Sequence, residues 1–166
     1  GLLLCKSEAQ PLIFGGTGSE SLEEGMPEYL PDRAEAGTLN VPGIAGLTAG
    51  LQYLRRVRVE RVGRREHIHA MRTAQGLQRL GFRVFTGDHQ AGTVSFVPEL
   101  DCEEAAQRLA EQGIGVRAGI HCAPLAHESA GTLETGTVRV SIGYDTSPVQ
   151  IAAFLRSASK MPRFAG

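Results

Sequence analysis

The apolar residues change their period at Gly81, and this change limits the fold more than any other feature of the sequence. From Val41 to about Leu80 they recur every three or four positions, which predicts two helices with a break near Gly63. The predicted buried stripes are Ile44, Leu47, Leu51 and Leu54 in the first helix, and Ile68, Met71, Ala74 and Leu77 in the second. Beyond Gly81 the period becomes two, as in a β-strand with one buried face.

Four strands and two further helices are predicted after Gly81. The strands are expected at residues 82–85, 93–97, 115–118 and 137–142, and the first two should pair as antiparallel neighbours across a glycine-bounded turn. Asp101 and Ser147 are typical N-cap residues, so each is predicted to begin a helix. The pattern predicts an α+β fold, in which an antiparallel sheet has helices packed on one side.

The first forty residues have a different character. A short buried strand is predicted at residues 1–5, and residues 6–40 are rich in glycine, proline and acidic residues without a sustained period. So long an irregular segment is usually functional, and we expect it to wrap a site or a subunit interface. Its Gly-Gly-Thr-Gly-Ser run at residues 15–19 offers amide and hydroxyl donors to an anion, although a flexible turn is the alternative interpretation.

Composition argues against several classes of function. A net charge of -1 gives no electrostatic reason to bind nucleic acid or an anionic membrane surface. No apolar run has the length of a membrane span, and the opening Gly1–Leu4 is too short for a signal-peptide core. Three cysteines cannot pair completely and form no disulfide framework, which favours a reducing cytoplasm.

Residues 117–127 concentrate more reactive side chains than any other segment. His121 precedes Cys122, Arg117 lies five positions before the cysteine, and Gly119 and Pro124 argue against a regular helix. A loop cysteine can be a nucleophile when nearby cations or imidazoles favour its thiolate, whereas a buried structural cysteine is the alternative. No zinc site is predicted, because the histidines and the cysteine here lack a ligand pair with suitable spacing.

The motifs in this half of the chain resemble a known family. Arg-Ala-Gly-Ile-His-Cys-Ala-Pro-Leu-Ala-His at 117–127 and Gly-Thr-Val-Arg-Val-Ser-Ile-Gly-Tyr at 136–144 are similar to the C-terminal part of class V aminotransferases, which are fold-type I enzymes that use pyridoxal phosphate. Within this family, the chain most resembles the branch that contains cysteine desulfurases and selenocysteine lyases. Residues 15–19 and 31–40 match the same family in the same order, so the resemblance covers nearly the whole chain.

This resemblance implies a domain arrangement and a set of partners. Residues 1–40 would be the tail of the large cofactor-binding α/β domain, with a strand and an active-site or interface loop. Residues 41–166 would be the small C-terminal domain with its linking helices. The resemblance also implies a cytoplasmic homodimer that acts on L-cysteine or a related amino acid and passes sulfur to an acceptor protein.

The resemblance further implies roles for individual residues. Cys122 would take the substrate sulfur as a persulfide and leave alanine, with His121 tuning or orienting the thiol. Arg139 and Arg117 would bind the substrate, with Arg139 holding its carboxylate, and Arg117 could also tune or orient the thiol. For the cofactor phosphate, the resemblance implies contacts from Gly16 and Thr17, the threonine reaching the phosphate of the neighbouring subunit.

One departure from the family concerns lysine. The chain has only Lys6 and Lys160, and neither lies in the Ser-His-Lys type of motif that holds the cofactor in this family. We therefore expect a C-terminal fragment that does not catalyse pyridoxal chemistry on its own. Two alternatives stay open: another class V aminotransferase or lyase, such as a selenocysteine lyase, and a non-catalytic domain that carries sulfur for a partner.

Overall fold

A computed structural model describes residues 2–7, 9–18, 20, 22 and 24–162 of the chain. The chain divides into two compact units, Gly1–Leu54 and Arg55–Gly166, which we describe separately. Among the described residues, no helix is both long enough and apolar enough to cross a membrane.

The first unit contains little regular structure before helix α1 (Val41–Val57), which continues past the boundary between the units. A short 3-10 helix, η1, covers Asp32–Ala34. The strand predicted at residues 1–5 is wrong for residues 2–5, which are irregular, and Gly1 lies outside the described residues. An apolar run becomes a strand only where a second strand satisfies its backbone hydrogen bonds, and residues 2–5 pair with none.

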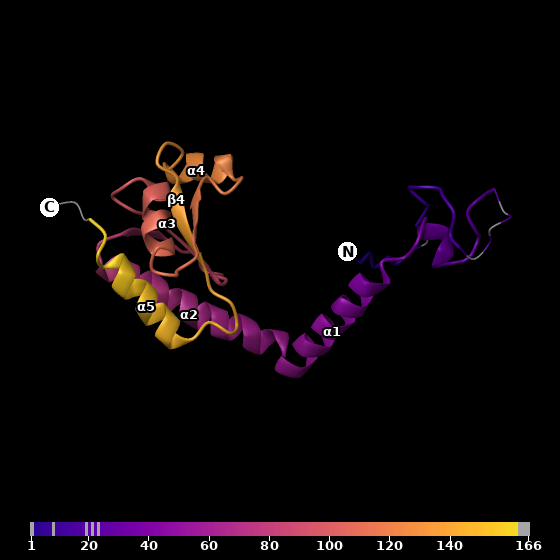
Figure 1. The fold of residues 1–166 in the computed structure, drawn as a ribbon, viewed down its shortest axis with the longest axis horizontal. Helices are drawn as coiled ribbons and strands as arrows, with labels where there is room; N and C mark the ends of the chain where they lie inside the picture. Colours follow the sequence, from indigo (N-terminus) through magenta and orange to yellow (C-terminus); the bar gives the residue numbers. More distant parts are fainter. Residues whose placement is uncertain (1, 8, 19, 21, 23, 163–166) are drawn as a thin grey trace. The chain divides into compact units, whose positions relative to one another are not determined.

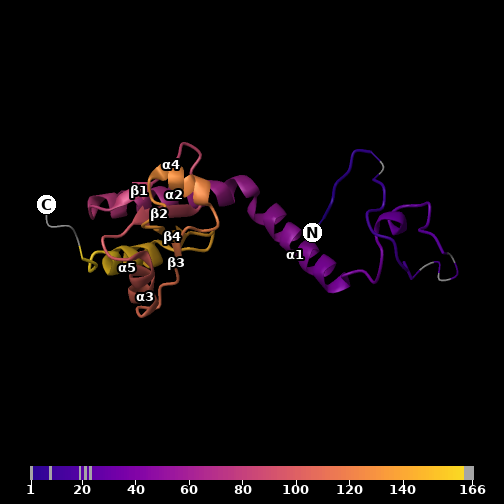
Figure 2. The same ribbon diagram turned by 90° about the horizontal axis from the view of Figure 1, so that it is seen from above.

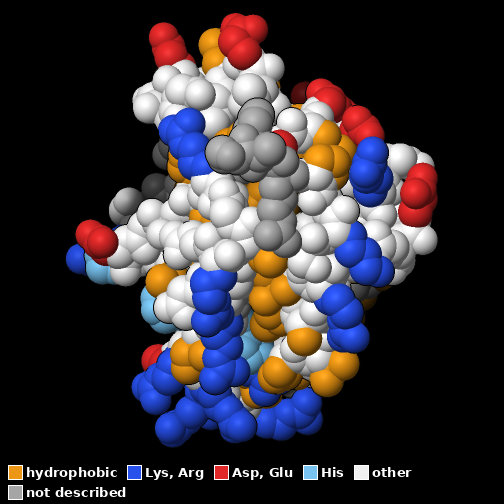
Figure 3. Space-filling model, turned by 90° about the vertical axis from the view of Figure 1, so that its left-hand side faces the viewer, with side chains coloured by type: hydrophobic (Ala, Val, Ile, Leu, Met, Phe, Trp, Pro, Cys, Tyr) orange, Lys and Arg blue, Asp and Glu red, His pale blue; other side chains and the backbone are white. Residues whose placement is uncertain are grey.

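The stripe predicted for the first helix is helical but not buried. No residue of α1 is buried, and Ile44 and Leu51 expose 50% and 53% of their surface. Figure 3 shows a different face, the left-hand side of Figure 1, where apolar side chains also lie between Lys and Arg side chains. The helical period was therefore predicted correctly, but burial requires a partner surface that these described residues do not supply.

The second unit contains most of the regular structure. Its elements are α2 (Val59–Arg79), β1 (Arg83–Phe85), β2 (Thr93–Val97), α3 (Cys102–Ala110), β3 (Arg117–Gly119), α4 (Pro124–Ala130), β4 (Thr137–Ser141) and α5 (Pro148–Ala158). The break between α1 and α2 lies at Arg58, with φ 69°, and not at Gly63. A helix tolerates an interior glycine at a cost of about 1 kcal/mol, so Gly63 stays helical.

The sheet has the strand order β1-β2-β4-β3, and every neighbouring pair is antiparallel. Val94 faces Val140 and Phe96 faces Val138, and these four side chains form the buried face. Helices α2 and α3 contact strands of the sheet, and α5 packs against both helices (Figure 1, Figure 2). This arrangement confirms the predicted α+β class.

Both predicted helix caps are present. The Asp101 carboxylate accepts hydrogen bonds from the backbone N–H groups of Glu103 and Glu104, at 2.9 and 3.2 Å. The Ser147 hydroxyl accepts from the Gln150 N–H, while the Gln150 side chain accepts from the Ser147 N–H at 2.8 Å. These reciprocal bonds satisfy donors that the first helical turn leaves free.

Helix α4 was not predicted. We expected residues 117–127 to contain no regular helix, but Pro124 begins α4 as its first residue, where a proline has no N–H to lose. The helix lies on the side of the sheet away from α2 and α5 (Figure 1), and Arg83 of β1 donates to the Ala130 carbonyl oxygen at 2.5 Å. The segment after Cys122 is therefore attached to the sheet.

Candidate active site

The site is built around the turn that follows β3. The strand ends at Gly119 with φ 99°, and His121 and Cys122 then adopt φ values of 57° and 60°. Left-handed backbone costs a residue with a side chain about 1–2 kcal/mol, so two such residues in succession are held there by their surroundings. The Cys122 side chain is exposed as a result, as a nucleophile requires.

Arg117 lies beside this cysteine. Its Nη2 is 3.8 Å from Cys122 Sγ, within hydrogen-bonding range for sulfur. A guanidinium at this distance stabilises negative charge on sulfur. The predicted pairing of Arg117 with Cys122 is thus present in the structure, whereas Cys102 is buried in the core and unsuited to attack.

Arg139 faces Arg117 across the sheet. The two residues are register partners of β4 and β3, so their side chains share the face opposite the core. Like charges directly opposite each other are unfavourable in a sheet, and an anion between them would remove the repulsion. Arg139 Nε is also buried without a hydrogen-bond partner among the described residues. A planar guanidinium with free donors suits a carboxylate.

His121 completes the group. Its Nε2 lies 3.1 Å from the Thr137 hydroxyl, and its Nδ1 is buried without a hydrogen-bond partner in the described part of the chain. Burial lowers the pKa of His121 below 6.5, and the nearby Arg139 charge lowers it further. The neutral form of the imidazole is therefore favoured at pH 7.

This environment predicts a titration result. NMR titration of His121 should give a midpoint below 6.5, and Arg139→Gln should move it upward because a cation is removed. Since the folded state resists protonation, this histidine should stabilise the fold above about pH 6.5, and the contribution should be lost as the pH falls through the lowered pKa. An unchanged midpoint in the Arg139 variant would contradict the assigned electrostatic coupling.

Two glycines close the base of the Cys122 loop. Gly136 has φ 62°, and a Cβ on it would lie 3.0 Å from Cys102 Sγ and 3.1 Å from the Gly119 Cα. Real Cβ atoms rarely come so close to their neighbours, so a side chain at residue 136 would force Cys102 or Gly119 to move by a few tenths of an ångström. The loop that carries Cys122 depends on this contact.

Gly136→Ala is therefore expected to destabilise the second unit by more than the cost of backbone strain alone. Gly131→Ala is the matched control, because Gly131 has φ 63° and open space around its Cβ position. Strain alone should cost each variant about 1–2 kcal/mol, and the steric overlap should add to that figure only at Gly136. Urea denaturation followed by far-UV circular dichroism measures the difference, and equal losses would contradict the overlap.

Gly16 and Thr17 lie in the first unit. Of the predicted site residues, the structure therefore brings together the four in the second unit, which are Arg117, His121, Cys122 and Arg139. Gly16 accepts a hydrogen bond from the Gly37 N–H at 2.7 Å, which ties the glycine run to the segment before α1. A small cleft of about 170 Å³ beside them is also lined by Glu20 and Glu24. Those carboxylates oppose an anion inside the cleft, whereas the Gly16 side-chain position is open.

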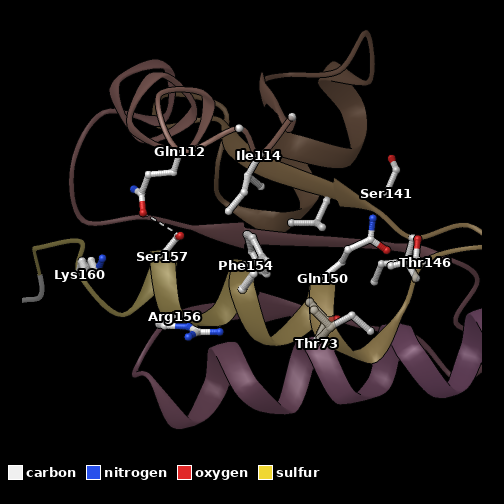
Figure 4. Close-up of a pocket in the computed structure, with 16 residues that line it drawn as sticks. Thr73, Gln112, Ile114, Ser141, Thr146, Gln150, Phe154, Arg156, Ser157 and Lys160 are labelled. Carbon is white, nitrogen blue, oxygen red and sulfur yellow. Dashed lines mark hydrogen bonds between the residues drawn. The ribbon is translucent and has the colours of Figure 1, made fainter.

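A more spacious cleft lies in the second unit, away from Cys122. It has a volume of about 510 Å³ and lies between α5, the end of β4 and the connection from α3 to β3 (Figure 4). Ser157 donates to Gln112 at 2.8 Å across one end of it. None of the predicted site residues lines this cleft, so its size does not identify it as the reaction centre.

Three residues near Cys122 were missed in the sequence. Thr137 contacts His121, while the buried His127 contacts the His121 ring and hydrogen-bonds to Thr132. The only local signal was a second histidine near the cysteine, which was weighed as a zinc ligand and set aside because of its spacing. Among the described residues, no three His, Cys, Asp or Glu side chains lie close enough together to hold a metal.

The fold and this group of side chains define a class of protein. It is a small antiparallel-sheet domain with an exposed cysteine beside one arginine and a second arginine on the neighbouring strand. The chain belongs to the aminotransferase class-V family, whose family model matches residues 1–154.

Similar proteins carry more specific names. The chain is 36% identical over 151 residues to a probable cysteine desulfurase from Pyrococcus abyssi, a match that covers 87% of this chain and 37% of that protein. A cysteine desulfurase from Synechococcus elongatus is 39% identical over 129 residues, covering 75% of this chain and 20% of its own.

Solved structures agree with these sequence matches. The apo cysteine desulfurase from Thermococcus onnurineus NA1 superposes with a TM-score of 0.80 at 35% identity, over 90% of this chain and 38% of that chain. A cysteine desulfurase from Escherichia coli in an S-sulfonic acid form gives 0.77 at 27% identity, over 89% and 37%. The chain thus spans less than two fifths of the length of these proteins.

Proposed function

We propose that this chain is the part of a pyridoxal-phosphate-dependent cysteine desulfurase that accepts the sulfur. The exposed Cys122 with Arg117 Nη2 at 3.8 Å carries the proposal, because this reaction needs an accessible thiolate. The names of the similar proteins support the same reaction. In this proposal, residues 1–40 are the tail of the large domain and residues 41–166 are the small domain.

The donors in the first unit suit a cofactor phosphate on the open side of the glycine loop. Gly16 and Thr17 would hold it there, since glycine amides approach phosphate oxygens closely and a threonine hydroxyl adds a donor. On the other side of this loop, the carboxylates of Glu20 and Glu24 repel an anion. When bound, pyridoxal phosphate supplies an electron sink that weakens the bond between carbon and sulfur in the substrate. Neither Lys6 nor Lys160 lies in the sequence context of a cofactor lysine.

The residues of the second unit would perform the sulfur transfer. The Cys122 thiolate attacks the sulfur of L-cysteine, forming a sulfur–sulfur bond while the substrate bond between Cβ and sulfur breaks. The electron pair stays with the substrate carbon, which takes up a proton and leaves as alanine. L-cysteine and the Cys122 thiol thereby become alanine and a Cys122 persulfide, with no external oxidant. Neutral His121 would accept the thiol proton before attack.

Arg139 would bind the substrate carboxylate, supported by its free Nε and by the facing Arg117. Arg139→Lys should therefore raise KM for L-cysteine by about tenfold or more, because a lysine cannot form the paired hydrogen bonds of a guanidinium. Steady-state kinetics of the cofactor-loaded protein measures this effect. An unchanged KM would remove Arg139 from the binding site.

The proposal also includes a cytoplasmic homodimer and an acceptor protein that receives sulfur from Cys122. The family resemblance supports both partners. Within the homodimer, Thr17 of each subunit would reach the cofactor phosphate bound by the other.

The test uses the cofactor-loaded protein that contains these residues together with a lysine-bearing large domain. It is incubated with L-cysteine, alanine is quantified, and the peptide containing Cys122 is weighed. We expect alanine release and a gain of about 32 Da on that peptide, the mass of one sulfur atom. Absence of both would overturn the proposal and favour another class V aminotransferase or lyase.

A further inference from the structure

The site contains a buried histidine that the proposed reaction does not use. His127 lies in α4, is 7% exposed, and donates its backbone N–H to the Ala123 carbonyl oxygen. A buried imidazole needs polar partners, and Thr132 supplies them: its hydroxyl oxygen is 2.9 Å and its carbonyl oxygen 3.2 Å from His127 Nδ1.

These contacts favour one arrangement of the proton on the His127 ring. A carbonyl oxygen can only accept, so the 3.2 Å contact needs a proton on Nδ1, whereas the Thr132 hydroxyl can either accept from this nitrogen or donate to it. The Thr132 hydroxyl can then donate to the His127 carbonyl oxygen, 3.5 Å away. The Thr132 N–H donates to the same carbonyl oxygen at 2.8 Å, so the ring and its backbone are held together.

The fixed His127 ring lies against the ring of His121. Their centroids are 5.8 Å apart with an angle of 48° between the planes. His121 is held at one nitrogen by a single hydroxyl: its Nε2 lies 3.1 Å from the Thr137 hydroxyl, whereas its Nδ1 is buried without a partner in the described part of the chain. His121 and Cys122 also occupy strained left-handed backbone directly before α4. Without a neighbour that restricts it, this ring could turn or change tautomer.

We propose that His127, anchored by Thr132, is a positioning residue that holds the His121 ring against Thr137 with its proton on Nε2, directly before the reactive cysteine in the chain. This inference rests on the proposed function, because it assigns His127 to the orientation of the same site. His127 acts through His121 and touches neither substrate nor cofactor.

The test needs no cofactor and uses the complete 166-residue chain. Two variants break the anchor: His127→Phe keeps a ring but loses Nδ1, and Thr132→Val keeps the volume but loses the hydroxyl. Thr132→Ser restores the hydroxyl and is the conservative rescue. His89→Asn is the control, since His89 is an exposed histidine in the turn between β1 and β2.

Two readouts separate positioning from packing. Long-range ¹H–¹⁵N spectra report the His121 tautomer, and mass spectrometry reports the iodoacetamide rate at the Cys122 peptide. We expect one tautomer with Nε2–H in the native chain, Thr132→Ser and His89→Asn. His127→Phe and Thr132→Val should show mixed His121 tautomers. In both variants iodoacetamide should alkylate Cys122 at no more than about one third of the native rate, as expected for residues coupled in one network.

A lower unfolding midpoint with an unchanged tautomer and an unchanged alkylation rate in Thr132→Val would overturn the proposal and leave His127 as a packing residue. If His127→Phe does not fold, Thr132→Val still tests the proposal by the same two measurements. If the desulfurase reaction fails but the His127 and Thr132 variants still change the His121 tautomer and the Cys122 alkylation rate, only the proposed function is overturned. If desulfuration occurs but these variants change neither readout, only this inference is overturned.

Discussion

Cys122→Ala is expected to lower alanine release from L-cysteine on the order of a thousandfold or more in the cofactor-loaded protein and to abolish the sulfur adduct. The reason is chemical: Cys122 is an exposed thiol that the structure places beside Arg117, whereas Cys102 is buried. Folding should be unaffected, since the Cys122 side chain is exposed. Alanine production and peptide mass are measured together, so that loss of catalysis is distinguished from loss of sulfur transfer.

Cys5→Ala is the matched control for this experiment. Cys5 is also a free and exposed cysteine, but it belongs to the first unit, away from the loop that carries Cys122 in the sequence. Its replacement should leave alanine release unchanged. If Cys122→Ala also retained full alanine release, Cys122 would be dispensable, and the chain would belong to a different class V enzyme.

Phe96→Ala is expected to produce the largest loss of stability. Phe96 is fully buried in β2, and its ring makes edge contacts with Phe82 at 5.1 Å and with Phe154 at 6.3 Å between centroids. Removing a buried phenylalanine costs about 3–5 kcal/mol, through lost transfer energy and the cavity left behind. That loss is a large part of the 5–15 kcal/mol typical of a domain.

Urea denaturation monitored by far-UV circular dichroism measures the loss, and Phe14→Ala provides the comparison. Phe14 exposes 71% of its surface, so its replacement should change the free energy of unfolding by less than about 0.5 kcal/mol. Equal effects at the two positions would show that the Phe82–Phe96–Phe154 contacts do not support the core of the second unit.

Much of the second unit was predictable because its signals are local. The alternation in residues 93–97 predicted β2 with the bounds observed, and Asp101 and Ser147 predicted the starts of α3 and α5. Cys122 and Arg117 could be paired from their spacing, because Arg117 begins a short strand and Cys122 lies in the turn that follows it. Caps, turns and strand periods depend on a few neighbouring residues, which a sequence displays directly.

The errors arose where a local signal competes with its surroundings. Gly63 suggested a break, but the chain breaks at Arg58, where one left-handed residue ends a helix that sequence period alone would continue. Pro124 suggested a loop, yet the same residue begins α4. The apolar stripe of α1 predicted burial that the described chain does not show. Glycine, proline and an amphipathic face each permit two outcomes, and the neighbouring structure selects between them.

The sequence by itself determined the strands, the caps, the reactive segment and the family resemblance. Only the tertiary structure placed Arg139 opposite Arg117, because that contact requires β3 to pair with β4 across the whole loop that carries Cys122. It also brought His127, which hydrogen-bonds to Thr132, against His121 through a helix that was not predicted. Pairings of this kind depend on strand register and on packing between distant residues, and neither is encoded in any short stretch of the chain.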